Sequence, residues 1–145
     1  MKLQAAAEAR DIDNILTAAE SVFQNMAQAA YPALWSGLSA QSRKSIIKNV
    51  RSAIGKTGFD YPEERLRTDF AAGGKLARDY WTSYVAEFAP KLVLEESKWT
   101  MGPIKNDYAE IIIRYRKSDR DTILRMFRED GAWKVGLDET FPTRW

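Results

Sequence analysis

The side chains that could do chemistry in this chain are carboxylates, tyrosines, lysines, arginines and hydroxyl groups, because it contains neither cysteine nor histidine. This composition excludes disulfide bonds, thiolate nucleophiles, zinc sites built on Cys or His, and catalytic triads that use an imidazole. Acid–base chemistry by an Asp or Glu beside a Tyr is what is left. We expect no metal site and no cofactor.

Six side chains are candidates for binding a ligand. They are Trp81, Tyr84, Trp99, Tyr115, Arg128 and Trp133. Aromatic side chains line most small-molecule sites, but aromatic stripes at helical spacing are usually core. Trp81 and Tyr84 are three residues apart on a predicted helix, so they are either core or the wall of a pocket. The same two interpretations apply to Trp99 and Trp133.

Arg128 is the single charged residue on an otherwise apolar predicted sheet face, between Ile111 and Trp133. Either its stem lies on apolar surface with the guanidinium in water, or the group binds an anion at the mouth of a pocket. An unpaired buried guanidinium is costly. We therefore expect a helix acid from the Glu63-Glu64 turn, solvent, or an acidic ligand to neutralise it.

The length of 145 residues and the hydrophobic content of 45% predict one globular domain over residues 1–145. The net charge is only +2, without the clustered excess typical of nucleic-acid binders, so we expect no nucleic-acid partner. No stretch approaches the roughly 18 apolar residues of a membrane span, so we expect no membrane partner.

Met1 to Arg10 lacks the apolar core of a signal peptide. A chain whose signal had been removed would look the same, so the localisation stays open between cytoplasmic and exported.

Hydrophobic periodicity changes from helical to alternating near the middle of the chain. Gly73-Gly74 interrupts the last helical stretch, which we expect to form two pieces. The predicted helices span about 5–31, 39–55 and 62–89, and the predicted strands span about 92–101, 107–117, 122–129 and 132–138.

Two turns set the register of the predicted sheet. Asp130-Gly131 is a strong two-residue hairpin signal, which pairs Arg128 with Trp133 and Leu124 with Leu137. A weaker even turn at Asp119-Arg120 pairs Tyr115 with Leu124. One face then carries the residues that should pack on the helices: Ala109, Ile111, Ile113, Tyr115, Leu124, Met126, Trp133, Val135 and Leu137.

The opposite sheet face is charged but not wholly polar. In this register Arg114 lies opposite Arg125, and the two repel unless acids or a partner compensate. Ile112, Ile123 and Phe127 would also lie on this face. The face is either solvated or an interface, and we expect a homodimer through it.

Helices on one face of a mostly antiparallel sheet predict an α+β fold. The segment Phe127 to Leu137, with its acid-Gly turn and Trp-Lys-Val strand, resembles the closing hairpin of the nuclear-transport-factor-2-like superfamily, also called ketosteroid-isomerase-like or cystatin-like. Ala33 to Ser39 resembles that superfamily's junction between its first two helices. The resemblance implies a curved sheet that curls around the N-terminal helices as a cone, with a pocket at the wide end and often a homodimer.

That superfamily includes isomerases, dehydratases, cyclases and transport adaptors, so the resemblance alone assigns no activity. Its dehydratases use His, which this chain lacks. We expect a non-catalytic small-ligand-binding or accessory domain that takes a small hydrophobic or acidic ligand. The alternative is an isomerase- or cyclase-type enzyme with a carboxylate base and a tyrosine in the cone pocket, for which Asp69 and Asp79 are the helix acids that could reach it.

One predicted helix is strongly basic, with Arg43, Lys44, Lys48 and Arg51 on it. Charge runs of this kind are usually solvated surfaces. We interpret it so, with contact to an acidic partner as the alternative.

Overall fold

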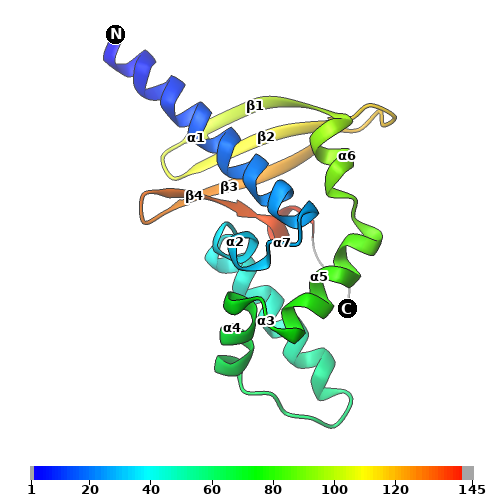
Figure 1. The fold of residues 1–145 in the computed structure, drawn as a ribbon. Coiled ribbons are helices and arrows are strands. Elements are labelled where there is room, and N and C mark those ends of the chain that lie inside the picture. Colours follow the sequence, from blue (N-terminus) through cyan, green and yellow to red (C-terminus); the bar gives the residue numbers. More distant parts are fainter. Residues whose placement is uncertain (1, 142–145) are drawn as a thin grey trace.

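The structure, a computed structural model, describes residues 2–141. Within this range the chain folds into seven helices and one four-stranded antiparallel sheet, which confirms the predicted α+β class (Figure 1). The helices are α1 (Lys2–Ala27), α2 (Tyr31–Ser36), α3 (Ala40–Gly55), α4 (Glu63–Ala72), α5 (Lys75–Glu87), α6 (Pro90–Glu95) and α7 (Leu137–Thr140). The strands are β1 (Ser97–Lys105), β2 (Tyr108–Tyr115), β3 (Thr122–Glu129) and β4 (Ala132–Gly136), adjacent in that order.

The long helix α1 lies across one face of the sheet, and helices α2 to α5 gather beyond the β4 edge (Figure 1). The junction between α2 and α3 runs beside this edge. The Ser39 amide donates to the Val135 carbonyl at 2.9 Å, and the Val135 amide donates to the Gly37 carbonyl at 2.9 Å. The outer edge of β4 is therefore partly covered by the chain itself.

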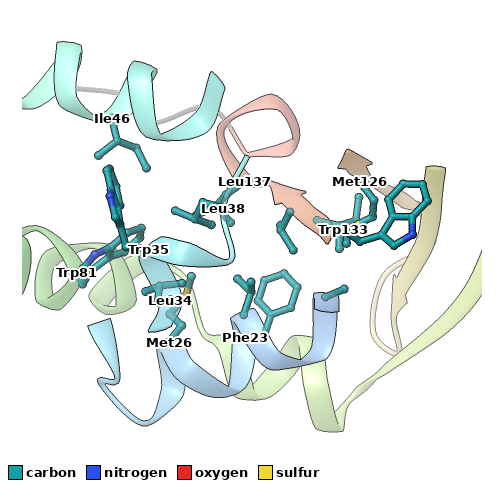
Figure 2. Close-up of a cluster of buried hydrophobic side chains, with 14 of the residues drawn as sticks. Phe23, Met26, Leu34, Trp35, Leu38, Ile46, Trp81, Met126, Trp133 and Leu137 are labelled. Carbon is teal, nitrogen blue, oxygen red and sulfur yellow. The ribbon is translucent and has the colours of Figure 1, made fainter. Parts of the chain in front are cut away.

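The sheet face toward α1 is the one that the alternation predicts. Its buried residues are Ala109, Ile111, Ile113, Leu124, Met126, Trp133 and Val135. Tyr115, expected on the same face, is partly exposed. In Figure 2 the core continues from Met126 on the sheet past Phe23 of α1 and Leu38 to Ile46 of α3. The sheet and the helical group thus share a continuous core.

The Asp130-Gly131 hairpin has the predicted register, with Arg128 opposite Trp133. Both turn residues have positive φ, 52° and 79°, which is the geometry of a primed two-residue turn. The expected pairing of Leu124 with Leu137 is wrong, because β4 ends at Gly136 and Leu137 begins α7.

The predicted register between β2 and β3 is also wrong. Ile111, rather than Tyr115, lies opposite Leu124, a shift of four residues, and the connection runs from Tyr115 to Thr122 instead of through a two-residue turn. An even shift keeps every side chain on its predicted face. The apolar pattern alone therefore cannot distinguish these two registers.

This correction removes the expected repulsion on the outer face. Arg125 lies opposite Glu110. Arg114 donates through Nε to Asp121 Oδ1 at 2.6 Å. The two arginines are therefore not opposed, and each has an acid nearby.

Residues 92–101 were expected to form one strand. The first part of this range belongs to α6, and β1 follows from Ser97 to Lys105. Residues 102–106, which fall between two predicted strands, are mostly strand, since β1 continues through an irregularity between Met101 and Ile104. The predicted strands over 107–117 and 132–138 end earlier, at Tyr115 and Gly136. Helix α2 lies largely between the predicted helices over 5–31 and 39–55, where no helix was predicted.

The break at Gly73-Gly74 between α4 and α5 is as predicted. Gly73 has a φ of 68°, in the left-handed region that ends many helices. A Cβ there would lie 3.0 Å from Pro32, so glycine also allows α4 to approach α2. No helix within residues 2–141 is long and apolar enough to cross a membrane.

Candidate functional site

The six candidate residues are spread over α5, β1, the end of β2 and the β3–β4 hairpin. Trp81 and Tyr84 lie on α5 among other aromatic rings. Arg128 and Trp133 lie together at the β3–β4 hairpin. Trp99 lies on β1 in a groove beside α1, and Tyr115 ends β2 opposite Ser97, which lines the same groove.

The α5 aromatic residues form a chain of ring contacts. Trp81 meets Tyr80 at 4.9 Å and Tyr84 at 5.4 Å between ring centroids, both edge-to-face, and Tyr84 meets Phe88 at 5.4 Å. Trp81 is fully buried. Its indole Nε1 has no hydrogen-bond partner among the described residues. This packing is typical of core, the first of the two interpretations that the sequence left open.

Tyr84 is mostly buried beside Asp138. Burial raises the pKa of its hydroxyl, and the neighbouring Tyr80 and Asp138 raise that pKa further. The hydroxyl therefore stays protonated at neutral pH.

Arg128 finds its counter-ions within the chain. Its Nε donates to Asp107 Oδ1 at 3.0 Å, and its NH1 donates to Asp11 Oδ1 at 3.4 Å. The guanidinium also lies 5.0 Å from the centre of the Trp133 ring. Of the three counter-ions expected for Arg128, a helix acid, solvent or an acidic ligand, the structure has a helix acid. This acid is Asp11 of α1. The Glu63-Glu64 turn is not involved, and Glu63 pairs with Arg67 at 3.0 Å.

A hollow beside Trp99 is the α1–β1 groove, which we define by Leu16 and Gln24 of α1, Leu94 of α6, and Trp99 and Met101 of β1. It has a volume of about 740 Å³, within the range of roughly 300–1,000 Å³ typical of small-molecule sites. Its β1 residues point to the inner face of the sheet, since Trp99 pairs with Ile113 and Met101 with Ile111.

The apolar floor of the α1–β1 groove is held in place. The Trp99 indole Nε1 donates to the Val93 carbonyl at 2.9 Å, and the ring meets Phe23 edge-to-face at 6.1 Å. Gln24 Nε2 donates to Glu20 Oε1 at 3.0 Å on the rim. Because the indole is fixed before any ligand arrives, binding would lose little side-chain entropy there.

The sequence prediction found Trp99 but missed the α1 and α6 walls of this groove. The apolar run Leu92 to Leu94 was expected to be a strand, and α6 places Leu94 and Lys91 on the groove instead. Pro90 at the first turn of α6 was the available signal, because proline is favoured there.

Neither helix acid that the sequence offered as a base lies free in a pocket. Asp69 accepts from the amides of Ala77 at 2.7 Å and Leu76 at 3.3 Å, and so caps the N-terminus of α5. Asp79 pairs with Lys75 at 2.8 Å on the surface. Both carboxylates therefore have local structural partners.

Two buried serines and one acid tie α3 to α7. Ser39 caps α3 by accepting from the Ser42 amide at 3.1 Å. The hydroxyls of Ser39 and Ser42 lie 2.7 and 2.5 Å from the Glu139 carboxylate. The Ala40 amide donates to Glu129 at 3.1 Å. One carboxylate and one hydroxyl thus already accept from two amides at the N-terminus of α3.

Among the described residues, no group of three or more Asp or Glu side chains is placed to hold a metal ion. The α1–β1 groove is the candidate binding site, with an indole floor and a polar rim. The chain matches no protein-family model, no curated protein and no solved structure.

Proposed function

We propose that this protein is a non-catalytic small-ligand-binding domain and that its ligand lies in the α1–β1 groove. The observation that carries the proposal is the combination of a volume of about 740 Å³ with a fixed indole floor at Trp99. Leu16, Leu94 and Met101 extend the apolar surface around the ring. An apolar ligand body would bury its surface there, and this burial is the main source of affinity in such sites.

The side chains on the rim of the groove indicate that the ligand also carries a polar group. Gln24 of α1 and Gln28, just after α1, offer amide donors and acceptors, and Lys91 of α6 offers a positive charge. Glu20 and Glu95 also lie on the rim, so the local charge is mixed. We propose a small amphipathic ligand whose apolar body covers Trp99 and whose polar group faces these side chains.

The same groove favours binding over the alternative of an isomerase- or cyclase-type enzyme. Such an enzyme needs a carboxylate and a tyrosine hydroxyl in one apolar pocket. The groove acids Glu20 and Glu95 are exposed, and no tyrosine lines the groove among the described residues. Tyr84 and Asp138 do lie near each other, but they are not part of this groove.

The resemblance to the nuclear-transport-factor-2-like superfamily is part of the same proposal. Two features support it: the order of helices followed by an antiparallel sheet, and a groove on the inner sheet face toward α1. The finer arrangement we propose is a sheet curved around α1 as a cone whose open side is this groove.

The test uses Nile red, a neutral fluorescent probe of apolar sites. We expect saturable binding to the wild type and at least about tenfold weaker binding to Gln24→Trp, because the indole would fill the groove from an exposed α1 position. Thr100→Trp is the matched control, since Thr100 is exposed on the same strand and faces away from the groove. Equal affinities in wild type and Gln24→Trp, or an equal loss in the control, would overturn the proposal.

A further inference from the structure

Helix α3 carries an unbalanced charge. Its 16 residues include Arg43, Lys44, Lys48 and Arg51 and no acid. Arg43 and Lys44 lie in its N-terminal half, where the helix dipole disfavours positive charge, and Lys44 and Lys48 are like charges four residues apart. In the isolated protein this arrangement lowers the stability of the fold. An advantage in binding a partner would explain why α3 carries these charges.

These cations line a continuous depression between α3 and α4, which we call the α3–α4 groove. It consists of two hollows that share Lys44 and Ile47. One, of about 490 Å³, reaches Trp35 and Arg67, and the other, of about 390 Å³, reaches Asp60. Figure 1 shows α3 and α4 next to each other, away from the sheet.

The acids on this groove do not balance its cations. Asp60 is paired with Arg51 at 3.3 Å, and Glu63 is paired with Arg67 at 3.0 Å. The other three groove cations, Arg43, Lys44 and Lys48, have no acidic partner among the described residues. The groove therefore keeps three uncompensated positive charges.

Arg43 adds a geometric observation. Its side chain is partly buried, and its Nε is buried without a hydrogen-bond partner among the described residues. A partly desolvated guanidinium without a counter-ion is unfavourable. An anion bound in the groove would supply the missing charge, and the guanidinium favours a carboxylate or phosphate.

The arrangement of the cations favours separate carboxylates over one compact phosphate. The free amides at a helix N-terminus often bind a phosphate. At the N-terminus of α3 the Ala40 amide already donates to Glu129, and the Ser42 amide already donates to Ser39. Lys44 and Lys48, four residues apart on one side of the helix, are about 6 Å apart along its axis at 1.5 Å per residue. An extended peptide presents side chains on one side about every 6.6 Å, a similar spacing.

We propose that the α3–α4 groove binds an extended, Asp/Glu-rich segment of a partner protein. Charge complementarity supplies the attraction, and Arg43, Lys44 and Lys48 contact successive carboxylates. Asp60 and Glu63, at one end, disfavour a polyanion that runs beyond the groove, such as a long nucleic acid. The proposal concerns a different surface from the α1–β1 groove and does not depend on it.

The experiment measures fluorescence anisotropy of a labelled hexaglutamate peptide with the full chain at about 50 mM salt. We expect binding by the wild type and at least about tenfold weaker binding by the double variant Lys44→Glu/Lys48→Glu. The matched control is Lys98→Glu/Lys105→Glu, which changes the net charge equally at exposed β1 positions and should bind within about twofold of the wild type.

The groove variant also has a stability readout. The variant places one acid at position 44, in the first half of α3, and a second acid three residues before Arg51, while the pair at positions 44 and 48 stays a like-charge pair. We therefore expect its melting temperature to equal or exceed that of the wild type. A melting temperature well below the wild type would contradict the strained-charge argument.

Three further outcomes would overturn the proposal. The first is no peptide binding by the wild type, and the second is the same loss of affinity in both charge-reversed variants. The third is a different occupant of the groove. It would be shown by a twelve-nucleotide single-stranded DNA that binds more tightly than hexaglutamate and depends on Lys44 and Lys48, or by inorganic phosphate that displaces the peptide at equal charge concentration. Preference for hexaglutamate over both would support it.

Discussion

Arg128 has the role of a structural ion-pair centre, because Asp11 of α1 and Asp107 of the β1–β2 turn both contact it. Its side chain is 31% exposed, so these pairs are partly screened by water. The sequence placed Arg128 correctly on the inner face but could not identify Asp11, which is 117 residues away and belongs to a helix whose orientation only the fold defines.

The first prediction concerns Arg128→Gln. The substitution leaves Asp11 and Asp107 without their shared cation, so we expect the free energy of unfolding to fall by about 1–2 kcal/mol. Urea denaturation measures it. Adding Asp11→Asn should cost less than the sum of the single variants, because the pair interaction is already lost. An additive double variant would show that the two side chains do not interact.

The ion pairs of Arg128 also determine whether this residue is needed to bind an acidic ligand. Since the guanidinium is neutralised within the chain, an acidic ligand is not needed as its counter-ion. We expect Arg128→Gln to bind an anionic hydrophobic probe as the wild type does.

The second prediction concerns Tyr84, whose pKa in the folded state lies above its ordinary value of about 10 because of burial. Below pH 10 the hydroxyl is protonated in both states and has no effect on the pH dependence. Above pH 10 the unfolded state loses the proton first, so the folded state loses stability at about 1.4 kcal/mol per pH unit.

Tyr84→Phe removes this contribution. We expect the unfolding free energy of the variant to fall less steeply between pH 10 and 11 than that of the wild type, as measured by chemical denaturation at each pH. Parallel curves for the two proteins would contradict the raised pKa.

At the scale of elements, the alternation of apolar residues was sufficient to place the sheet faces. Ala109, Ile111 and Met126 are buried where the pattern predicts them, and Ile123 is exposed. The register of the β3–β4 hairpin was predicted correctly from Asp130-Gly131, because this residue pair favours a two-residue turn with positive φ at both positions. Local chemistry therefore determined both features.

The β2–β3 register could not be obtained in the same way. The Ser118 to Asp121 segment has no single favoured turn, and a shift of four residues leaves each face unchanged. What distinguishes the observed register is polar pairing across the strands, Arg125 with Glu110 and Arg114 with Asp121. Testing registers against charge pairs, as well as against apolar faces, would have found it.

The two missed helices share a physical cause. Both α2 and α6 have six residues and a proline in the first turn. The predicted helices end just before Pro32 and Pro90, although proline is equally favoured at the start of the next helix. Because α6 forms one wall of the α1–β1 groove, this ambiguity also hid part of the candidate site.

At the scale of the whole molecule, the proposed homodimer depends on the outer sheet face. Two features of the sequence favoured this dimer, the opposed arginines and the exposed apolar side chains. The structure removes the first, since Arg114 and Arg125 each have an acid nearby. The other reason is apolar exposure. Ile123 is 42% exposed, while Ile112 and Phe127 are partly buried.

A stable dimer buries about 800 Å² on each partner, more than three side chains provide. The paired charges around Ile123 would therefore form the rim of such an interface, where they can stay hydrated while the apolar centre is covered. A charge introduced at that centre would be desolvated without a partner, so the apolar centre is the place to test.

The third prediction is that Ile123→Glu abolishes self-association. We expect the wild type to sediment at micromolar concentration with twice the monomer mass of 16.5 kDa, and the variant to sediment as a monomer. Leu92→Glu is the control, because Leu92 is similarly exposed, at 37%, but lies on α6 away from the outer face. A monomeric wild type would show that Ile112, Ile123 and Phe127 are too small a patch to hold two copies together. In that case their exposure is the ordinary apolar content of a protein surface.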